Sequence, residues 1–177
     1  MKLNTLMIWF AVLLISFSSE AQNNKSISKL EEVSLGDSKQ WIHIQGKDTN
    51  NPILLFLHGG PGFTQMPFSH KDSELLEEHF IVVNWDQLGA GKSYSKKIRS
   101  QEMTVNRFLD DTHELIQLLK KRFNKEKIFL LGHSWGSCLG LYTAINYPED
   151  LHAFIGMGQA INLLQGEIDG YNFTLQK

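Results

Sequence analysis

Four short apolar runs recur along the chain and predict the strands of a buried sheet. Each is bounded by polar residues, glycine or proline. Because these runs are nearly continuous rather than alternating, we expect each strand to be covered on both faces. The runs are Ile53 to Leu57, Phe80 to Trp85, Ile128 to Leu131 and Leu151 to Met157.

The segments between these runs show helical spacing of their apolar positions. Thr104 to Phe123 carries the clearest apolar stripe, with Thr104 as its expected N-cap. Trp135 to Tyr147 is expected to be a second helix, which Pro148 ends. Pro67 to His79 is expected to be a third, with three apolar residues on one face, namely Phe68, Leu75 and Leu76.

The order of these elements predicts the fold class. Leu30 to Ser34 and Trp41 to Gln45 predict a hairpin at the start of the domain. Strands then alternate with helices from Ile53 to Met157, so we expect an α/β fold with a mostly parallel sheet and helices on both faces. Ligands bind such sheets at the carboxyl ends of the strands, where three polar residues are expected, namely His58, Asp86 and Ser134.

Composition limits the function classes. The chain has 177 residues, 42% of them hydrophobic, and a net charge of -2, which suits one globular domain and gives no basic surface for nucleic acid. Its seven histidines lack metal-ligand spacing, so we expect no metal. Cys138 is the single cysteine, which excludes an internal disulfide and favours a buried thiol.

The N-terminus has the pattern of a signal peptide over residues 1–21. Lys2 provides a positive start, Leu6 to Phe17 is apolar, and Ser19 to Ala21 offers small residues for cleavage before Gln22. A spanning helix needs about 20 apolar residues. We therefore expect an exported, periplasmic or extracellular protein with no stable membrane insertion; the alternative is an uncleaved N-terminal anchor.

Gly132-His133-Ser134-Trp135-Gly136 predicts a nucleophile elbow, because a predicted strand precedes it and a predicted helix follows it. Ser134 would be the catalytic nucleophile, and the main-chain N–H of Trp135 would point at a developing oxyanion. The alternative is a glycine-rich turn in which Ser134 only caps the helix.

Two further glycine-rich loops follow predicted strands. His58-Gly59-Gly60-Pro61-Gly62 lets main chain approach a ligand, and the Gly60 N–H is expected to be the second oxyanion donor. Asp86 to Ser93 looks like a phosphate-binding P-loop. However, that motif needs glycine where Asp86 stands, and no strongly apolar helix follows Ser93, which argues against a nucleotide site.

Together, these motifs resemble those of the proline iminopeptidase (prolyl aminopeptidase) family of α/β-hydrolases, over about Leu30 to Met157. The resemblance implies the α/β-hydrolase fold and a serine peptidase, or related acyl hydrolase, that removes an N-terminal residue, usually proline, without a cofactor. Leu88 departs from the family, which usually has arginine after Asp-Gln. The resemblance also implies that residues 159–177 begin a helical cap, in which Glu167 would grip the free amino group of the substrate.

The same resemblance implies that the triad aspartate and histidine lie beyond Lys177. His152 is expected at the far end of the sheet from Ser134, because the intervening helix carries the chain roughly 20 Å away. We therefore expect residues 22–158 to form the N-terminal part of a hydrolase core, inactive as this truncated chain. The alternatives are an esterase or lactonase, acting on a small ester rather than a small peptide, and a non-catalytic remnant.

Overall fold

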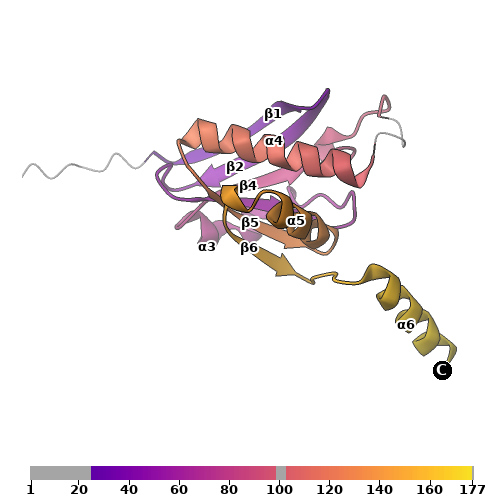
Figure 1. The fold of residues 1–177 in the computed structure, drawn as a ribbon. Helices are drawn as coiled ribbons and strands as arrows, with labels where there is room; N and C mark the ends of the chain where they lie inside the picture. The colour runs from indigo at the N-terminus through magenta and orange to yellow at the C-terminus, as the bar shows by residue number, and fades with distance from the viewer. Residues whose placement is uncertain (1–24, 99–102, 177) are drawn as a thin grey trace, which may run out of the picture.

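The computed structural model describes residues 25–98 and 103–176, so the expected signal peptide lies outside the described residues. The described part contains a six-stranded sheet with the strand order β1-β2-β4-β3-β5-β6 (Figure 1). Its strands are β1 (Ile27–Leu35), β2 (Ser38–Gly46), β3 (Ile53–Leu57), β4 (Ile81–Asp86), β5 (Ile128–His133) and β6 (Leu151–Met157). All the predicted strands are present within a few residues of their expected bounds.

The sheet is antiparallel at one side and parallel over the rest. β1 and β2 form the predicted hairpin, and β2 also runs antiparallel to β4. β3 lies between β4 and β5 and is parallel to both, and β6 is parallel to β5. The carboxyl ends of β3, β4 and β5 therefore meet at one edge, as expected for a mostly parallel sheet.

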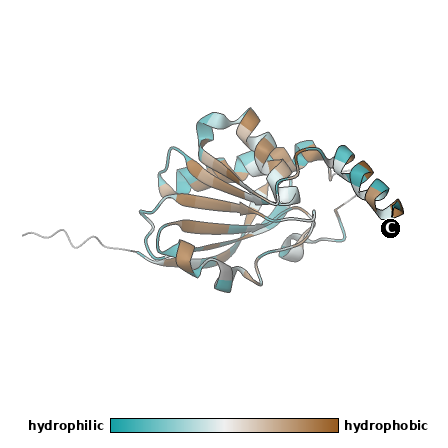
Figure 2. Cartoon of the chain, turned by 90° about the horizontal axis from the view of Figure 1, so that it is seen from below, coloured by the Kyte–Doolittle hydropathy of each residue, from teal (hydrophilic) through white to brown (hydrophobic). Residues whose placement is uncertain are grey.

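Helices α4 (Val105–Phe123) and α5 (Trp135–Asn146) cover one face of the sheet, as Figures 1 and 2 show. The Thr104 side chain accepts a hydrogen bond from the Arg107 amide, so Thr104 is the N-cap that the sequence predicts. Leu115, Ile116 and Leu119 of α4 are fully buried in the core against the sheet. α5 ends within one residue of its predicted end, and the short 3₁₀ helix η3 (Pro148–Asp150) follows it.

The opposite face has much lighter cover. The predicted helix from Pro67 to His79 is wrong: the structure has two single turns there, α2 (Ser69–Asp72) and α3 (Glu74–Glu77). The Ser73 hydroxyl donates to the Ser69 carbonyl oxygen at 2.5 Å, where the two turns meet. The expected apolar face is not buried, since Phe68 is 55% exposed and Leu75 is 84% exposed.

Buried polar contacts tie α4 to the elements at its two ends. Near its start, Arg107 Nε donates to Asp111 Oδ1 at 2.8 Å, and Gln40 of β2 donates to Asp111 Oδ2 at 2.6 Å. Burial raises the pKa of Asp111 above its usual value. Further along α4, Lys120 forms an ion pair with the buried Asp150 of η3. These contacts fix α4 across the sheet that carries the candidate site.

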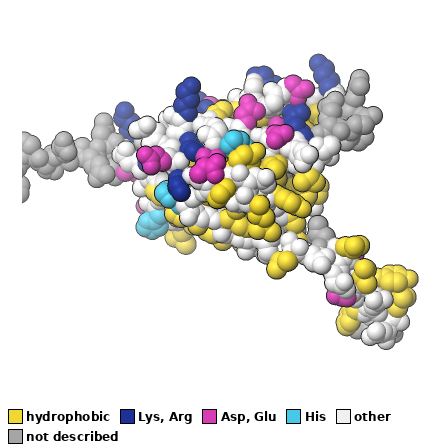
Figure 3. Space-filling model, viewed as in Figure 1, with side chains coloured by type: hydrophobic (Ala, Val, Ile, Leu, Met, Phe, Trp, Pro, Cys, Tyr) yellow, Lys and Arg dark blue, Asp and Glu magenta, His cyan; other side chains and the backbone are white. Residues whose placement is uncertain are grey.

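α6 (Leu163–Leu175) extends away from the sheet, beyond the end of β6 (Figure 1). Its apolar residues are largely exposed, and Figure 3 shows them as a separate hydrophobic area. A second hydrophobic area lies over α5, where Tyr142 is 50% and Ile145 is 66% exposed, whereas charged side chains gather over α4 (Figure 3). Within the described ranges no helix is both long and apolar enough to cross a membrane.

Candidate active site

Ser134 stands at a sharp turn between β5 and α5. Its backbone has φ 52° and ψ -116°, a region that residues other than glycine rarely adopt. The Ser134 amide donates to the Met157 carbonyl oxygen at 2.9 Å, which holds the turn against the end of β6. The side chain is exposed at the carboxyl edge of the sheet. This is the geometry of a nucleophile elbow.

The two glycines of the elbow are required by close main-chain contacts. A Cβ added to Gly132 would lie 2.2 Å from the Gly136 carbonyl oxygen. A Cβ added to Gly136 would lie 2.0 Å from the Leu57 carbonyl oxygen at the end of β3. α5 therefore starts directly against β3 and β5, and only glycine permits this approach.

The glycine-rich loop after β3 lies beside the elbow. A Cβ added to Gly59 would lie 3.3 Å from the Ser134 Cβ, so the loop and the elbow are in contact. Gly60 has φ 115°, which favours glycine, and the Phe63 amide donates to the Gly59 carbonyl oxygen at 3.2 Å to close the turn. On the other side, Trp135 is the first residue of α5, where an amide has no acceptor within the helix. The structure thus brings the segments of Ser134, Gly60 and Trp135 together.

His58 is fully buried at the base of this loop, and its hydrogen bonds define its tautomer. The Gln87 amide donates to His58 Nε2 at 3.1 Å, so that nitrogen carries no proton. Nδ1 therefore carries the proton and donates to the Gly59 carbonyl oxygen at 2.9 Å. Burial lowers the pKa of His58, which keeps the ring neutral. His58 thus holds the loop in shape through these two hydrogen bonds.

The P-loop-like segment after β4 has a structural explanation. Asp86 Oδ2 accepts a hydrogen bond from the Lys92 amide at 2.7 Å, and its other oxygen accepts one from the Thr64 hydroxyl. A Cβ on Gly91 would lie 2.2 Å from Asp86 Oδ2, so glycine is needed there. The Lys92 ammonium lies 4.5 Å from the centroid of the Trp41 ring. Asp86 thus occupies the centre of the turn with its own carboxylate.

Within residues 25–98 and 103–176, no side chain hydrogen-bonds to the Ser134 hydroxyl. His152 lies near the start of β6, at the opposite end of the sheet from the elbow, where its ring packs 5.0 Å from that of Phe129. Glu167 is exposed on α6, which lies away from the elbow (Figure 1). The structure therefore does not bring His152 or Glu167 to Ser134. The Cys138 thiol is buried and contacts the Ala160 carbonyl oxygen at 3.5 Å.

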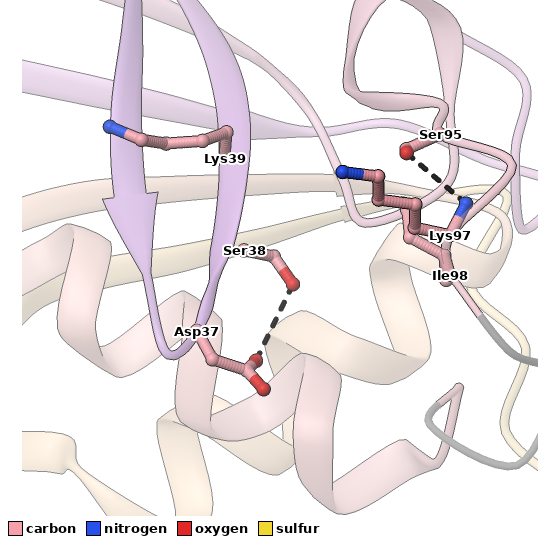
Figure 4. A pocket seen from close by; sticks show the side chains of 6 residues that line it. All are labelled: Asp37, Ser38, Lys39, Ser95, Lys97 and Ile98. Carbon is pink, nitrogen blue, oxygen red and sulfur yellow. Dashed lines mark hydrogen bonds between the residues drawn. The ribbon is translucent and has the colours of Figure 1, made fainter.

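Three cavities in the described part of the chain are lined by residues other than Ser134. One of about 510 Å³ lies beside the β1–β2 turn and is lined by polar residues including Asp37, Lys39 and Lys97 (Figure 4). One of about 370 Å³ lies next to Thr64 and Asp86. The third, of about 290 Å³, is mostly apolar and lies under α2 and α3. Within the part of the chain that the structure describes, no cluster of three or more potential metal ligands is present.

Sequence reasoning missed the part that Gln87 plays at this site. In the sequence, Gln87 is recognisable only as the second residue of the Asp-Gln pair of the family motif. In the structure, its buried side chain contacts both the loop after β3 and the indole of Trp135. The available signal was a polar residue directly after a strand that is buried on both faces.

Comparison with known proteins places these features in a family. The family model described as serine aminopeptidase S33 matches residues 48–172 of this chain. A probable aminopeptidase of Bacillus subtilis strain 168, YbaC, is 44% identical over 147 residues, which are 83% of this chain and 46% of that protein. A proline iminopeptidase of Clostridium botulinum is 36% identical over 120 residues, which are 66% of this chain and 39% of the relative. The chain thus spans less than half the length of both relatives.

Solved structures show the same fold. The proline iminopeptidase-related protein from Thermus thermophilus has a TM-score of 0.65 at 26% identity, covering 77% of this chain and 46% of its own. An epoxide hydrolase from Vigna radiata also has a TM-score of 0.65, at 23% identity, covering 76% of this chain and 39% of its own. The expected α/β-hydrolase fold and the resemblance to the proline iminopeptidases are both confirmed, and the chain belongs to the serine aminopeptidase S33 family.

Proposed function

We propose that this chain carries the nucleophile half of a serine aminopeptidase that releases an N-terminal proline, or a similar residue, from small peptides. The observation that supports this proposal most directly is the strained, exposed Ser134 at the end of β5, with the glycine-rich loop in contact with it. The serine aminopeptidase family and the proline iminopeptidase relatives support the proposed class of substrate.

In the proposed reaction the Ser134 oxygen attacks the carbonyl carbon of the N-terminal residue and loses its proton to a histidine base. The amides of Gly60 and Trp135 donate to the resulting oxyanion, which lowers the barrier because they need no reorganisation. The base then protonates the leaving amine, the C–N bond breaks, and water hydrolyses the acyl-enzyme. We propose that the triad histidine and aspartate come from the region that the longer relatives have and this chain does not span. Without them, Ser134 is an ordinary alcohol.

An esterase or lactonase remains the second candidate, because the same nucleophile and oxyanion donors serve any acyl transfer. Glu167, the residue expected to grip a free amino group, is exposed on α6 away from the elbow, and this position supports keeping the esterase as a candidate. Epoxide hydrolysis is a poorer match despite the structural neighbours. A serine oxygen that opened an epoxide would form an ether, and water would not release the product from it.

The test uses the protein expressed from its native reading frame, together with any residues that the frame encodes after Lys177, and a fluorophosphonate probe, which labels only an activated serine. We expect labelling that disappears in Ser134→Ala and persists in Ser28→Ala, an exposed serine on β1. Turnover of a proline arylamide is expected to exceed that of a simple aryl ester. Rapid ester turnover with an inert arylamide would favour the esterase, and a folded protein without labelling would favour the non-catalytic remnant.

A chimera tests the role of the C-terminal region that the relatives have and this chain does not span. The 177-residue chain is compared with the same chain joined to the C-terminal part of the B. subtilis relative. We expect labelling of Ser134 in the chimera and none in the isolated chain. Equal labelling of both would contradict the proposal that the base lies outside this chain.

A further inference from the structure

Gln87 is the residue through which the two sides of the proposed oxyanion hole are connected. It follows β4, it is 1% exposed, and it lies between the loop after β3 and the start of α5. Its side-chain Nε2 donates to the His58 carbonyl oxygen at 3.2 Å. Its Oε1 accepts from Trp135 Nε1 at 3.1 Å. One amide group therefore spans the gap between the segments that carry Gly60 and Trp135.

The orientation of this amide is determined by its partners. A carbonyl oxygen such as that of His58 can only accept, and an indole N–H such as that of Trp135 can only donate. Gln87 must therefore present its NH₂ to His58 and its oxygen to Trp135. Its main-chain N–H also donates to His58 Nε2, so residue 87 holds His58 by two separate bonds.

Each end of this bridge is itself held in place. The neutral His58 ring donates to the Gly59 carbonyl oxygen, which adjoins Gly60. The Trp135 ring packs edge-on against Phe108 of α4, with 5.7 Å between centroids. A displacement of residue 87 is thus transmitted to the Gly59–Gly60 peptide on one side and to the first residue of α5 on the other.

We infer that Gln87 is a positioning residue that holds the Gly60 and Trp135 amides at the separation an oxyanion requires. The inference rests on the proposed function, because it concerns the donors of that reaction. Gln87 does not touch the substrate in this arrangement. It acts through the loop and the indole, and a misplacement of about 1 Å in such donors costs about 100-fold in rate.

The chain offers a matched control in Gln40. Its side chain is also fully buried, accepts from the indole of Trp85 at 3.0 Å and donates to Asp111 at 2.6 Å. Gln40→Met and Gln87→Met each remove one bond from an indole and one donated bond, to a carboxylate for Gln40 and to a main-chain carbonyl oxygen for Gln87. Only the second change lies next to the elbow, so a difference between the two variants separates positioning from general loss of stability.

The experiment uses the protein expressed from its native reading frame, together with any residues encoded after Lys177. It measures the rate constant for fluorophosphonate labelling of Ser134, and kcat and KM for the proline arylamide. Gln87→Met is expected to lower the labelling rate and kcat by about 10- to 100-fold with little change in KM, because oxyanion donors act in the transition state. Gln40→Met is expected to stay within about twofold of the unmodified protein, because distant sites are nearly independent. Equal rates in the two variants would overturn the inference.

Gln87→Glu adds a pH readout that simple destabilisation would not imitate. A protonated glutamic acid can donate a hydrogen bond to the His58 carbonyl oxygen, as the amide does. A carboxylate has no proton to donate, so this hydrogen bond is lost when the glutamate ionises. The ratio of variant to unmodified labelling rate is therefore expected to fall as the pH rises from about 5 to about 8, with burial raising the glutamate pKa toward that range. A flat ratio over this range would contradict the inference. Absence of Ser134-dependent labelling in the unmodified protein from the native reading frame would instead overturn the proposed function, and the inference with it.

Discussion

Replacing Gly136 with alanine is expected to destabilise the fold, although alanine is the better helix former. The position lies in α5, where the change from glycine to alanine favours helix by about 1 kcal/mol. However, the new Cβ would lie 2.0 Å from the Leu57 carbonyl oxygen and 2.8 Å from that of His58. Real Cβ atoms essentially never come within 3.0 Å of such atoms, so the start of α5 must move by about 1 Å.

This displacement determines the magnitude. The obstacle is the backbone of β3 and of the glycine-rich loop after it, which cannot rotate away as a side chain can. Overpacking of this kind costs about 1 to 3 kcal/mol, and we take the upper value because main chain must shift. Subtracting the gain in helix propensity leaves a net loss of about 2 kcal/mol in the free energy of unfolding.

The assay is urea unfolding followed by far-UV circular dichroism, with Gly166→Ala as the control. Gly166 is also helical, but a Cβ there meets nothing within 4 Å. The control is expected to be neutral or slightly stabilising, since only helix propensity changes. If Gly136→Ala proved as stable as Gly166→Ala, the close approach of α5 to β3 would be refuted, and with it the reason given for the second glycine of the elbow.

Two further predictions concern pH. Burial would raise the pKa of Asp150, but hydrogen bonds from Lys120 and Gln117 lower it below its usual value. The ionised Asp150 therefore stabilises the folded chain fully above the unfolded pKa of about 3.9, and this stabilisation is lost as the pH falls through the lower folded pKa. In urea unfolding, the unmodified chain is expected to be more stable than Asp150→Asn at neutral pH, and this difference is expected to shrink below about pH 4. Burial lowers the pKa of His58, so the unfolded chain binds a proton that the folded chain rejects, and stability falls as the pH drops below about 6.5. Thermal melting between about pH 5 and pH 7.5 should show a weaker dependence in His58→Asn, and an unchanged slope would contradict the neutral, buried assignment.

The predicted elements succeeded where one physical signal dominated. The run Ile53 to Leu57 is β3 residue for residue, because a short apolar stretch bounded by turn residues has few alternatives to a buried strand. Thr104 to Phe123 is α4 with its N-cap, because the stripe is long enough for packing and capping to agree. Pro67 to His79 failed, because its few apolar residues have no second layer to pack on and stay largely exposed.

The sequence by itself determined the local geometry around Ser134. G-x-S-x-G between a strand and a helix requires the sharp turn, because any side chain larger than hydrogen at Gly132 or Gly136 meets main chain. Such a requirement involves residues close together in the sequence or in adjacent strands, so a short pattern is enough to reveal it.

Only the tertiary structure decided how the separate motifs work together. Gln87 bridges His58 and Trp135 because β3, β4 and β5 lie side by side. This arrangement brings His58, 29 positions before Gln87, and Trp135, 48 positions after it, to one side-chain amide group. The assignment of Lys92 and Gly91 to a turn around Asp86 likewise needed the folded arrangement, since their spacing alone resembles a phosphate loop. Hydrogen bonds between distant segments carry no periodicity along the chain, and for this reason only the three-dimensional structure reveals them.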